Sequence, residues 1–230
     1  MSGRIDEYQK ETVEAYQDGS KALAYDRQHS NGLTWARFTM WREINAVKRA
    51  LRELGLDQGR FLDVPCGTGV AAQSFNSVDG LVTAVDISRE MMNLARGRYD
   101  TETFQGLLQG DIAALPFSDG AFDATVTLGF MHRVPERIKR AAMRELIRVT
   151  RGVLVISFSV ESPFQQLKRA LVTRFRPGQI FAPAPWELGR IEDLVLSLGL
   201  RIRRRVMVMP FLSAETVLVL EKTESLNHLV

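Results

Sequence analysis

The feature that most constrains the fold is an alternation of short apolar runs with helical stretches, which begins at Arg60. Five of the apolar runs indicate strands, and they cover residues 61–64, 81–87, 103–109, 122–128 and 153–158. Helical patterns lie between them at 69–76, 88–98 and 134–149. Strands and helices that alternate at this spacing predict right-handed crossovers and a buried parallel sheet with helices on both faces. We therefore expect an α/β protein with a three-layer sandwich.

The carboxyl-terminal part ends this pattern differently. A helix at about 186–198 leads to strand-like runs at 201–209 and 216–220, and the connection between the two runs is short. A parallel crossover needs about a dozen residues or more, so this last pair is expected to form an antiparallel hairpin. The sequence thus predicts a mostly parallel, seven-stranded sheet with a reversed last strand.

The first 58 residues are more polar and read as helical. Apolar residues recur at three- and four-residue steps from Trp41 to Leu54, which predicts an apolar stripe on a helix that ends near Gly55. We expect residues 1–58 to form a helical lid on the same domain.

Composition excludes several classes of protein. Of the 230 residues, 45% are hydrophobic and 25% charged, which is enough apolar mass for a core and excludes a disordered chain. The single Cys66 excludes a disulfide scaffold and a cysteine zinc cluster, and it favours a reducing compartment. No apolar stretch approaches the roughly 18–20 residues that cross a bilayer, and the amino terminus does not resemble a signal peptide. We expect a cytoplasmic protein.

Charge is unevenly distributed along the chain. Residues 130–210 contain 16 Lys and Arg against 6 Asp and Glu, whereas the remainder contains 14 against 21, although the net charge of the whole is only +3. We interpret the basic half as a hint that the substrate, or a surface near it, is anionic.

The stretch Leu62–Val70 (LDVPCGTGV) lies where the first strand should meet its helix. Gly67 and Gly69 permit a tight turn and close approach of a ligand, and the following helix offers free N–H groups. Acidic residues end three successive strands: Asp63, Asp86 and Asp111. Because the carboxyl ends of parallel strands line one crevice, these carboxylates are expected to converge on a nucleotide-like ligand.

Four features together resemble the class I S-adenosylmethionine-dependent methyltransferases of the small-molecule, type 11-like kind. They are LDVPCGTGV, AVDIS with REMMNLAR, QGDIAALPFSDGAFDATVTLGFMHRV and the reversed last strand. The resemblance covers about residues 60–222. It implies a Rossmann-like fold in which 59–230 bind S-adenosylmethionine, which becomes S-adenosylhomocysteine, and in which about 161–185 form a second lid.

The resemblance also implies a cofactor site. Asp63 and the glycine turn would hold the methionine part, Asp86 the ribose hydroxyls, and Asp111 with the N–H of Ile112 the adenine edge. An acidic pocket suits this cofactor, whose sulfonium and amine outweigh one carboxylate. The implied cofactor residues are Tyr25, Asp63, Pro65, Gly67, Thr68, Gly69, Asp86, Ile87, Met91, Asp111, Ile112 and Leu128.

Two features depart from the simplest reading of this loop. Pro65 stands where the family commonly has glycine, so the loop path is expected to differ locally. The pattern Gly67-x-Gly69-x-x-Ala72 also satisfies a looser dinucleotide fingerprint, which keeps an NAD-dependent oxidoreductase as an alternative. Asp63 argues against that alternative, because a pyrophosphate tolerates a neighbouring negative charge poorly.

His132 is the candidate catalytic residue, since it follows the fourth strand and titrates in a range suited to proton abstraction. The alternative is that it only packs near the methionine part of the cofactor. No metal is expected. The residues predicted to contact the substrate are Tyr16, Arg27, Arg42, Arg133 and Phe164.

Other aromatic and basic residues have simpler interpretations. We expect Trp41 to pack its helix onto the sheet. In the second lid, Phe164, Leu167 and Leu171 share a helical face, and the basic residues beside them face an anionic substrate, a membrane surface or solvent. Strand alternation should send Arg203 and Arg205 to one face and Arg204 to the other, which argues against a nucleic-acid stripe.

The sequence therefore predicts an enzyme that methylates an O or N atom of a small metabolite, which is anionic or partly apolar. The alternatives are methylation of RNA or protein and a non-catalytic cofactor-binding module. We expect no nucleic-acid partner and no transmembrane segment, and peripheral membrane contact stays open.

Overall fold

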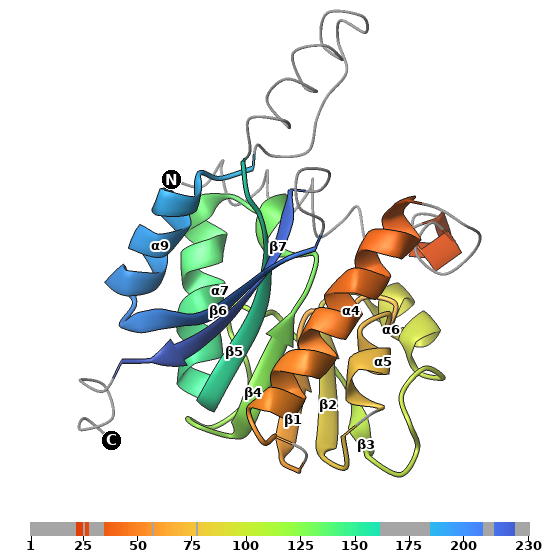
Figure 1. Ribbon diagram of the computed structural model, residues 1–230. Helices are drawn as coiled ribbons and strands as arrows, with labels where there is room; N and C mark the ends of the chain where they lie inside the picture. The colour runs from red at the N-terminus through yellow and green to blue at the C-terminus, as the bar shows by residue number, and fades with distance from the viewer. Residues whose placement is uncertain are drawn as a thin grey trace, which may run out of the picture.

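The computed structural model shows a seven-stranded sheet between two layers of helices (Figure 1). It describes residues 22–24, 26, 27, 35–56, 58–76, 78–161, 185–208 and 214–223. Its helices are α4 (Trp35–Glu53), α5 (Ala72–Phe75), α6 (Arg89–Ala95), the 3-10 turn η2 (Met131–Arg133), α7 (Glu136–Val149) and α9 (Leu188–Ser197). Its strands are β1 (Arg60–Asp63), β2 (Leu81–Asp86), β3 (Phe104–Gln109), β4 (Phe122–Thr127), β5 (Thr150–Ser159), β6 (Leu200–Met207) and β7 (Glu215–Lys222).

The strands lie in the order β3-β2-β1-β4-β5-β7-β6. The first five are parallel to one another, and β7 runs antiparallel to both of its neighbours, β5 and β6. This confirms the predicted α/β sheet with a reversed last strand. The short connection between β6 and β7 explains the reversal, because it leaves no room for a crossover helix.

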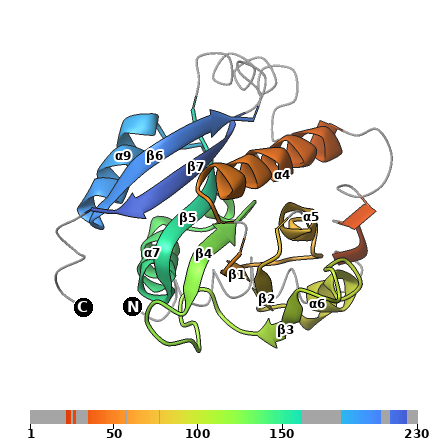
Figure 2. The same cartoon turned by 60° about the horizontal axis from the view of Figure 1, so that its bottom comes forward.

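Helices cover both faces of the sheet, as predicted. In both views α4, α5 and α6 lie on one face, and α7 and α9 lie on the other (Figure 2). A hydrophobic core lies on each face of the sheet. In β1, Phe61 packs in the core beneath α4, α5 and α6, which we call the first face, and Leu62 packs in the core beneath α7 and α9. Both side chains are fully buried, as expected for a central parallel strand.

The strand order creates a switch point between β1 and β4. The chain moves from β1 outward to β2 and β3, then returns to the other side of β1 with β4. In open α/β sheets, the crevice for a ligand forms where the connections from two neighbouring strands diverge. The loops that follow β1 and β4 therefore frame the candidate site.

Two expectations for the first face were wrong. The helix expected at 69–76 is limited to α5, because Gly69 adopts a φ of 77° that an α-helix excludes. Trp41 does not pack α4 onto the sheet and is 53% exposed. A helix turns by about 100° per residue, so Met40 instead completes the buried stripe with Ile44 and Val47.

The last strands bear out the alternation expected for the arginines. Arg203 and Arg205 are exposed, and Arg204 is half-buried and paired with Glu53 of α4. Of the predicted first lid, residues 1–58, the structure describes 22–24, 26, 27, 35–56 and 58, which include α4. Of the predicted second lid, at about 161–185, it describes only the two end residues. Within the part of the chain that the structure describes, no helix is long and apolar enough to cross a membrane.

The start of β5 gives a test of this packing. A Cβ at Gly152 would overlap the carbonyl oxygen of Asp123, so Gly152→Ala is expected to lower the free energy of unfolding by about 1–3 kcal/mol. The matched control is Gly189→Ala in α9, where a Cβ meets nothing within 4 Å and a helical alanine should stabilise by up to about 1 kcal/mol. Urea denaturation measures both changes, and equal midpoints for the two variants would contradict the close approach of β4 and β5.

Candidate functional site

The loop after β1 is a tight turn held against β2. The peptide bond between Val64 and Pro65 is cis, and the N–H of Cys66 donates to the carbonyl oxygen of Val85 at 2.8 Å. A Cβ at Gly69 would lie 2.9 Å from the Cα of Ala95, so only glycine lets the loop pack this closely on α6. At Gly67 a Cβ would meet nothing within 4 Å, which leaves its backbone open to a ligand.

Asp86 fastens this loop to the end of β2. Its side chain is 5% exposed, and its two oxygens accept from the N–H of Gly67 at 2.7 Å and of Ser88 at 2.8 Å. Burial raises the pKa of Asp86, and the N–H donors of Ser88 and Gly67 oppose that rise. The carboxylate therefore sets the relative position of the first two strand ends.

Asp63 lies at the end of β1 and is 1% exposed. Its Oδ2 accepts from the hydroxyl of Tyr99 at 2.6 Å, while its Oδ1 is buried and has no hydrogen-bond partner among the described residues. Burial raises the pKa of Asp63 to about 7; the bond from Tyr99 opposes this rise, and the charge of Asp86 adds to it. The hydroxyl oxygen of Thr68 is also buried without a partner. Unsatisfied buried groups of this kind are costly, so the site favours a ligand with donors or a positive charge.

The third strand end joins the same edge. The N–H of Gly110 donates to the carbonyl oxygen of Asp86 at 3.0 Å, which holds the loop after β3 beside β2. Asp111 is half-buried, and its Oδ1 accepts from the N–H of Ala113 at 2.9 Å. The apolar residues predicted to border the adenine are half-buried or buried: Ile87, Met91 and Ile112.

A second group of buried polar side chains lies at the ends of β4 and β5, and we call it the proton cluster: Glu43, His132, Arg133, Ser157 and Glu215. His132 stands in η2, directly after β4, and its Nδ1 lies 3.8 Å from Oε2 of Glu215 at the start of β7. Glu43 reaches the cluster from α4 and hydrogen-bonds to Ser157. The hydroxyl of Ser157 also accepts from the N–H of Gly129 at 2.9 Å.

Burial controls the protonation of this cluster. It raises the pKa of both Glu43 and Glu215, and the charge of Glu215 raises that of Glu43 further, whereas Arg133 opposes both rises. Burial lowers the pKa of His132 to about 4, with smaller contributions from Arg133 and Lys139. At neutral pH the imidazole is therefore neutral, and it is a weaker base than an exposed histidine.

The structure locates only some of the residues predicted to touch a substrate. Tyr16 and Phe164 lie outside the described residues, as does Tyr25, which was predicted for the cofactor. Arg133 belongs to the proton cluster, and its Nε donates to the carbonyl oxygen of Gly129 at 2.8 Å. Arg27 is exposed, and the exposed Arg42 instead donates to the carbonyl oxygen of Val208 at 3.0 Å. Leu128, predicted for the cofactor, is half-buried against the core of the first face.

Sequence reasoning missed Glu43, Tyr99 and Glu215. Glu43 carried a usable signal, because an acidic residue within the buried stripe of an amphipathic helix is unusual. Nothing in the local sequence marks Glu215 or Tyr99, since each gains its role from a partner on a distant element. Among the described residues, no group of His, Cys, Asp and Glu side chains could hold a metal ion.

Comparison with known proteins gives a consistent picture. The model of a family described as "Methyltransferase domain" matches residues 61–152. A demethylmenaquinone methyltransferase of Staphylococcus aureus is 31% identical over 175 residues, which cover 71% of this chain and 69% of the relative.

Solved structures share the fold. The magnesium protoporphyrin IX methyltransferase of Synechocystis PCC 6803, solved with bound S-adenosylhomocysteine, superposes with a TM-score of 0.75 at 16% identity and covers 97% of this chain and 100% of its own. The 1,6-didemethyltoxoflavin-N1-methyltransferase of Burkholderia thailandensis, solved with 1,6-didemethyltoxoflavin and S-adenosylhomocysteine, gives 0.64 at 16% identity and covers 96% and 89%. At these identities the likeness establishes the architecture.

The buried Asp63 makes stability depend on pH. Its pKa in the folded protein, about 7, exceeds the ordinary 3.8, so its contribution to stability is full at low pH and is lost as the pH rises toward 7. Asp63→Asn keeps an acceptor for Tyr99 and removes the buried charge. We expect it to raise the free energy of unfolding by about 1–3 kcal/mol at mildly alkaline pH, and by less in acid.

Urea unfolding at two pH values measures this difference. The matched control is Asp193→Asn, which makes the same change at an exposed position of α9 and should alter stability little at either pH. A gain for Asp63→Asn that does not depend on pH would contradict the assigned titration.

Proposed function

Because the chain belongs to the class I S-adenosylmethionine-dependent methyltransferases, we propose that it transfers a methyl group to an oxygen or nitrogen atom of a small metabolite. The enzyme class follows from the family, and the acceptor is the part that we propose. The observation that carries the proposal is the proton cluster: His132 follows β4, the neighbour of β1 in the sheet, and its Nδ1 lies 3.8 Å from Oε2 of Glu215.

The residues at the ends of β1 and β2 fit the cofactor. In the part of the chain that the structure describes, neither the buried Oδ1 of Asp63 nor the buried hydroxyl oxygen of Thr68 has a hydrogen-bond partner. The open space beside Gly67 lies in the same turn. A ligand with a positive amine would satisfy Asp63. Each oxygen of Asp86 already accepts one backbone N–H and has one further lone pair, which would suit a ligand with two neighbouring hydroxyls.

S-adenosylmethionine, when bound, supplies a methyl group on a positively charged sulfur that leaves in a direct displacement. The chain has to bind the cofactor, exclude water and align the acceptor with this methyl group. We assign binding to the loop of residues 65–71 with Asp63, Asp86 and Asp111. Holding the two reactants in line supplies much of the rate, so a proton acceptor is required only for a protonated nucleophile.

His132 is the proposed proton acceptor. Oε2 of Glu215 lies 3.8 Å from Nδ1, which is beyond hydrogen-bond distance, and neither atom has a hydrogen-bond partner among the described residues. In our proposal the two atoms approach when the substrate binds, which holds the proton on Nδ1 and makes Nε2 the acceptor. A negative charge on Glu215 also stabilises the imidazolium that forms when His132 takes the proton. Glu43 shares this environment and influences whether Glu215 is charged.

Burial of the cluster favours a small acceptor. The side chain of His132 is only 16% exposed, so the nucleophilic atom must enter the interior to reach it. A compact metabolite with an ionisable hydroxyl or amine meets that requirement more readily than a folded RNA or protein. The names of the similar proteins support a small acceptor, since they refer to demethylmenaquinone, magnesium protoporphyrin IX and 1,6-didemethyltoxoflavin.

The acceptor class can be tested with methyl-labelled S-adenosylmethionine. The protein is incubated with the label and with a cell extract separated into metabolites, RNA and protein. We expect label in the metabolite fraction and none there with heat-inactivated protein. Label confined to RNA or to protein would overturn the small-molecule proposal while leaving methyl transfer intact.

Asp86→Ala tests the cofactor site. Loss of charge-assisted hydrogen bonds should weaken binding of S-adenosylmethionine by about 1.5–3 kcal/mol in titration calorimetry. Asp100→Ala, an exposed aspartate after α6, serves as the control and should bind as the parent does. Unchanged affinity in Asp86→Ala would show that the ribose is held elsewhere.

His132→Ala and Glu215→Gln test the proton step together. His132→Ala should lower kcat by about 100-fold and leave cofactor affinity unchanged. An isolated imidazole with a pKa of about 4 would give a flat rate through the neutral range. Because burial raises the pKa of Glu215, we instead expect kcat to rise with pH as its carboxylate forms.

Glu215→Gln should abolish that rise and leave a lower, flat profile. A parent profile that is flat through neutrality would remove Glu215 from the proposed mechanism. A His132→Ala variant as fast as the parent would remove His132 as the proton acceptor.

A further inference from the structure

A groove of about 480 Å³ runs between the outer side of α4 and the end of β6, and no side chain of the proton cluster lines it. We call it the α4–β6 groove. The groove is lined by apolar residues and by several cations. The lining residues are Trp41, Arg42, Asn45, Ala46, Lys48, Arg49, Arg52, Glu53, Val206, Met207 and Val208. Neither the family nor the proposed reaction assigns a role to this groove.

The cations of the groove are not neutralised. Within the part of the chain that the structure describes, Lys48, Arg49 and Arg52 form no ion pair with a carboxylate. Glu53 is the acidic residue of the lining, and it is paired with Arg204 of β6. The groove therefore presents a positive field to solvent.

Large apolar side chains stand exposed beside these cations. Trp41 is 53% exposed and lies one helical turn from Phe38, with ring centroids 6.0 Å apart. Met207 at the end of β6 is 49% exposed on the facing wall. Exposed tryptophan, phenylalanine and methionine are costly in water, which points to a partner that accepts apolar groups.

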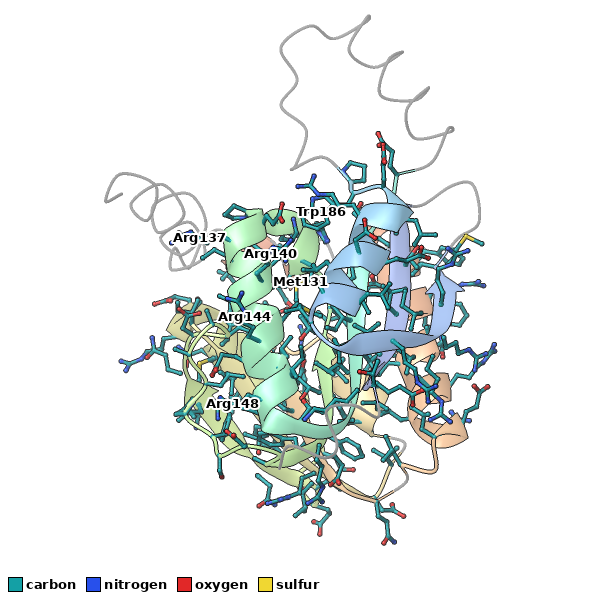
Figure 3. The ribbon with its side chains drawn as sticks, turned by 90° about the vertical axis from the view of Figure 1, so that its left-hand side faces the viewer. Met131, Arg137, Arg140, Arg144, Arg148 and Trp186 are labelled. Atoms are coloured by element: carbon teal, nitrogen blue, oxygen red, sulfur yellow. The ribbon has the colours of Figure 1, made fainter. Side chains whose placement is uncertain are left out.

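A row of arginines on α7 differs from the groove, because two of its members are paired with carboxylates and no large exposed apolar side chain lies on that helix. Figure 3 shows Arg137, Arg140, Arg144 and Arg148 in line along α7, on the other face of the sheet. Arg140 is bonded to Glu136, and Arg148 to Glu145 and Asp119. None of the large exposed hydrophobic residues among the described ones lies on α7. This row is a partly neutralised helix surface, so basic charge alone does not distinguish the α4–β6 groove.

We propose that the α4–β6 groove docks the protein on a membrane surface that contains anionic phospholipid. Lysine and arginine bind lipid phosphates, and each contributes near a negatively charged bilayer. Tryptophan and other amphipathic or apolar side chains insert at the boundary between headgroups and acyl chains. The exposed Met207 and the half-buried Val206 favour lipid over RNA, because aliphatic side chains offer nucleic acid neither stacking nor hydrogen bonds.

The groove and the proton cluster lie on different sides of α4, although the N–H of Val208 in the groove donates to the carbonyl oxygen of Glu215 at 3.0 Å. Glu43 faces the proton cluster from the buried side of α4, whereas Trp41 and Arg49 lie on its exposed sides. Methyl transfer does not depend on the inference, and the inference does not depend on the acceptor. The two can therefore fail separately.

Co-sedimentation of the full chain with vesicles tests the proposal. The probes are vesicles of phosphatidylcholine alone and vesicles of phosphatidylcholine mixed with phosphatidylglycerol. We expect the protein to sediment with the mixed vesicles, and added salt to weaken this binding. Arg49→Glu with Arg52→Glu should reduce binding by about tenfold or more, and Trp41→Ala by several-fold.

The matched control is Arg137→Glu with Arg144→Glu on α7, which changes the net charge by the same amount on exposed arginines. It should bind the mixed vesicles nearly as the parent does. All variants are checked for parental calorimetric affinity for S-adenosylmethionine, which shows that they are folded.

Three outcomes would overturn the proposal. They are absence of binding to the mixed vesicles, equal binding to both kinds of vesicle, and equal losses in the α7 control and the groove variants. A fourth would replace the partner: retention of a single-stranded RNA probe that Arg49→Glu with Arg52→Glu abolishes, without vesicle binding by the parent.

Discussion

The burial of two carboxylates at the ends of adjacent strands is the constraint on which the site depends. Asp86 is satisfied from within the chain, since the N–H groups of Gly67 and Ser88 bond to it and thereby fix the loop after β1. Asp63 is satisfied only in part, by the hydroxyl of Tyr99. Asp86 therefore holds the turn in place. Asp63, when ionised, is a buried negative charge that a cationic ligand stabilises.

Helix α4 connects the chemistry to the exterior. Its buried stripe of Met40, Ile44 and Val47 holds it on the sheet, and Glu43, on the same side, reaches the proton cluster. Its exposed side carries Trp41 and the cations of the α4–β6 groove. One amphipathic helix thus carries a buried apolar stripe, a residue of the proton cluster and the exposed surface that we propose for binding. Its buried side therefore faces the proton cluster, and its exposed side forms the proposed membrane-binding surface.

Much of the fold was predictable because its causes are local. The period of the hydrophobic pattern determines which segments become strands, and the length of the last connection determines which strand is reversed. The positions of Asp63, Asp86 and Asp111 follow from where the predicted strands end. The errors occur where tertiary packing decides. The rotation of α4 depends on which residues reach the sheet, so Met40 rather than Trp41 is buried. Glu215 joins His132 only because β7 returns beside β5, and no local pattern reveals that contact.

The most direct test of the account measures protons released when the cofactor binds. Burial raises the pKa of Asp63 to about 7, so its carboxyl group is largely protonated at slightly acidic pH. A cationic amine bound beside it would lower this pKa and release the proton. Titration calorimetry with S-adenosylmethionine at slightly acidic pH, in buffers of different ionisation enthalpy, counts the protons. The account predicts binding with release of up to about one proton, which Asp63→Asn abolishes. Binding without proton release, or binding of NADH in place of S-adenosylmethionine, would contradict it.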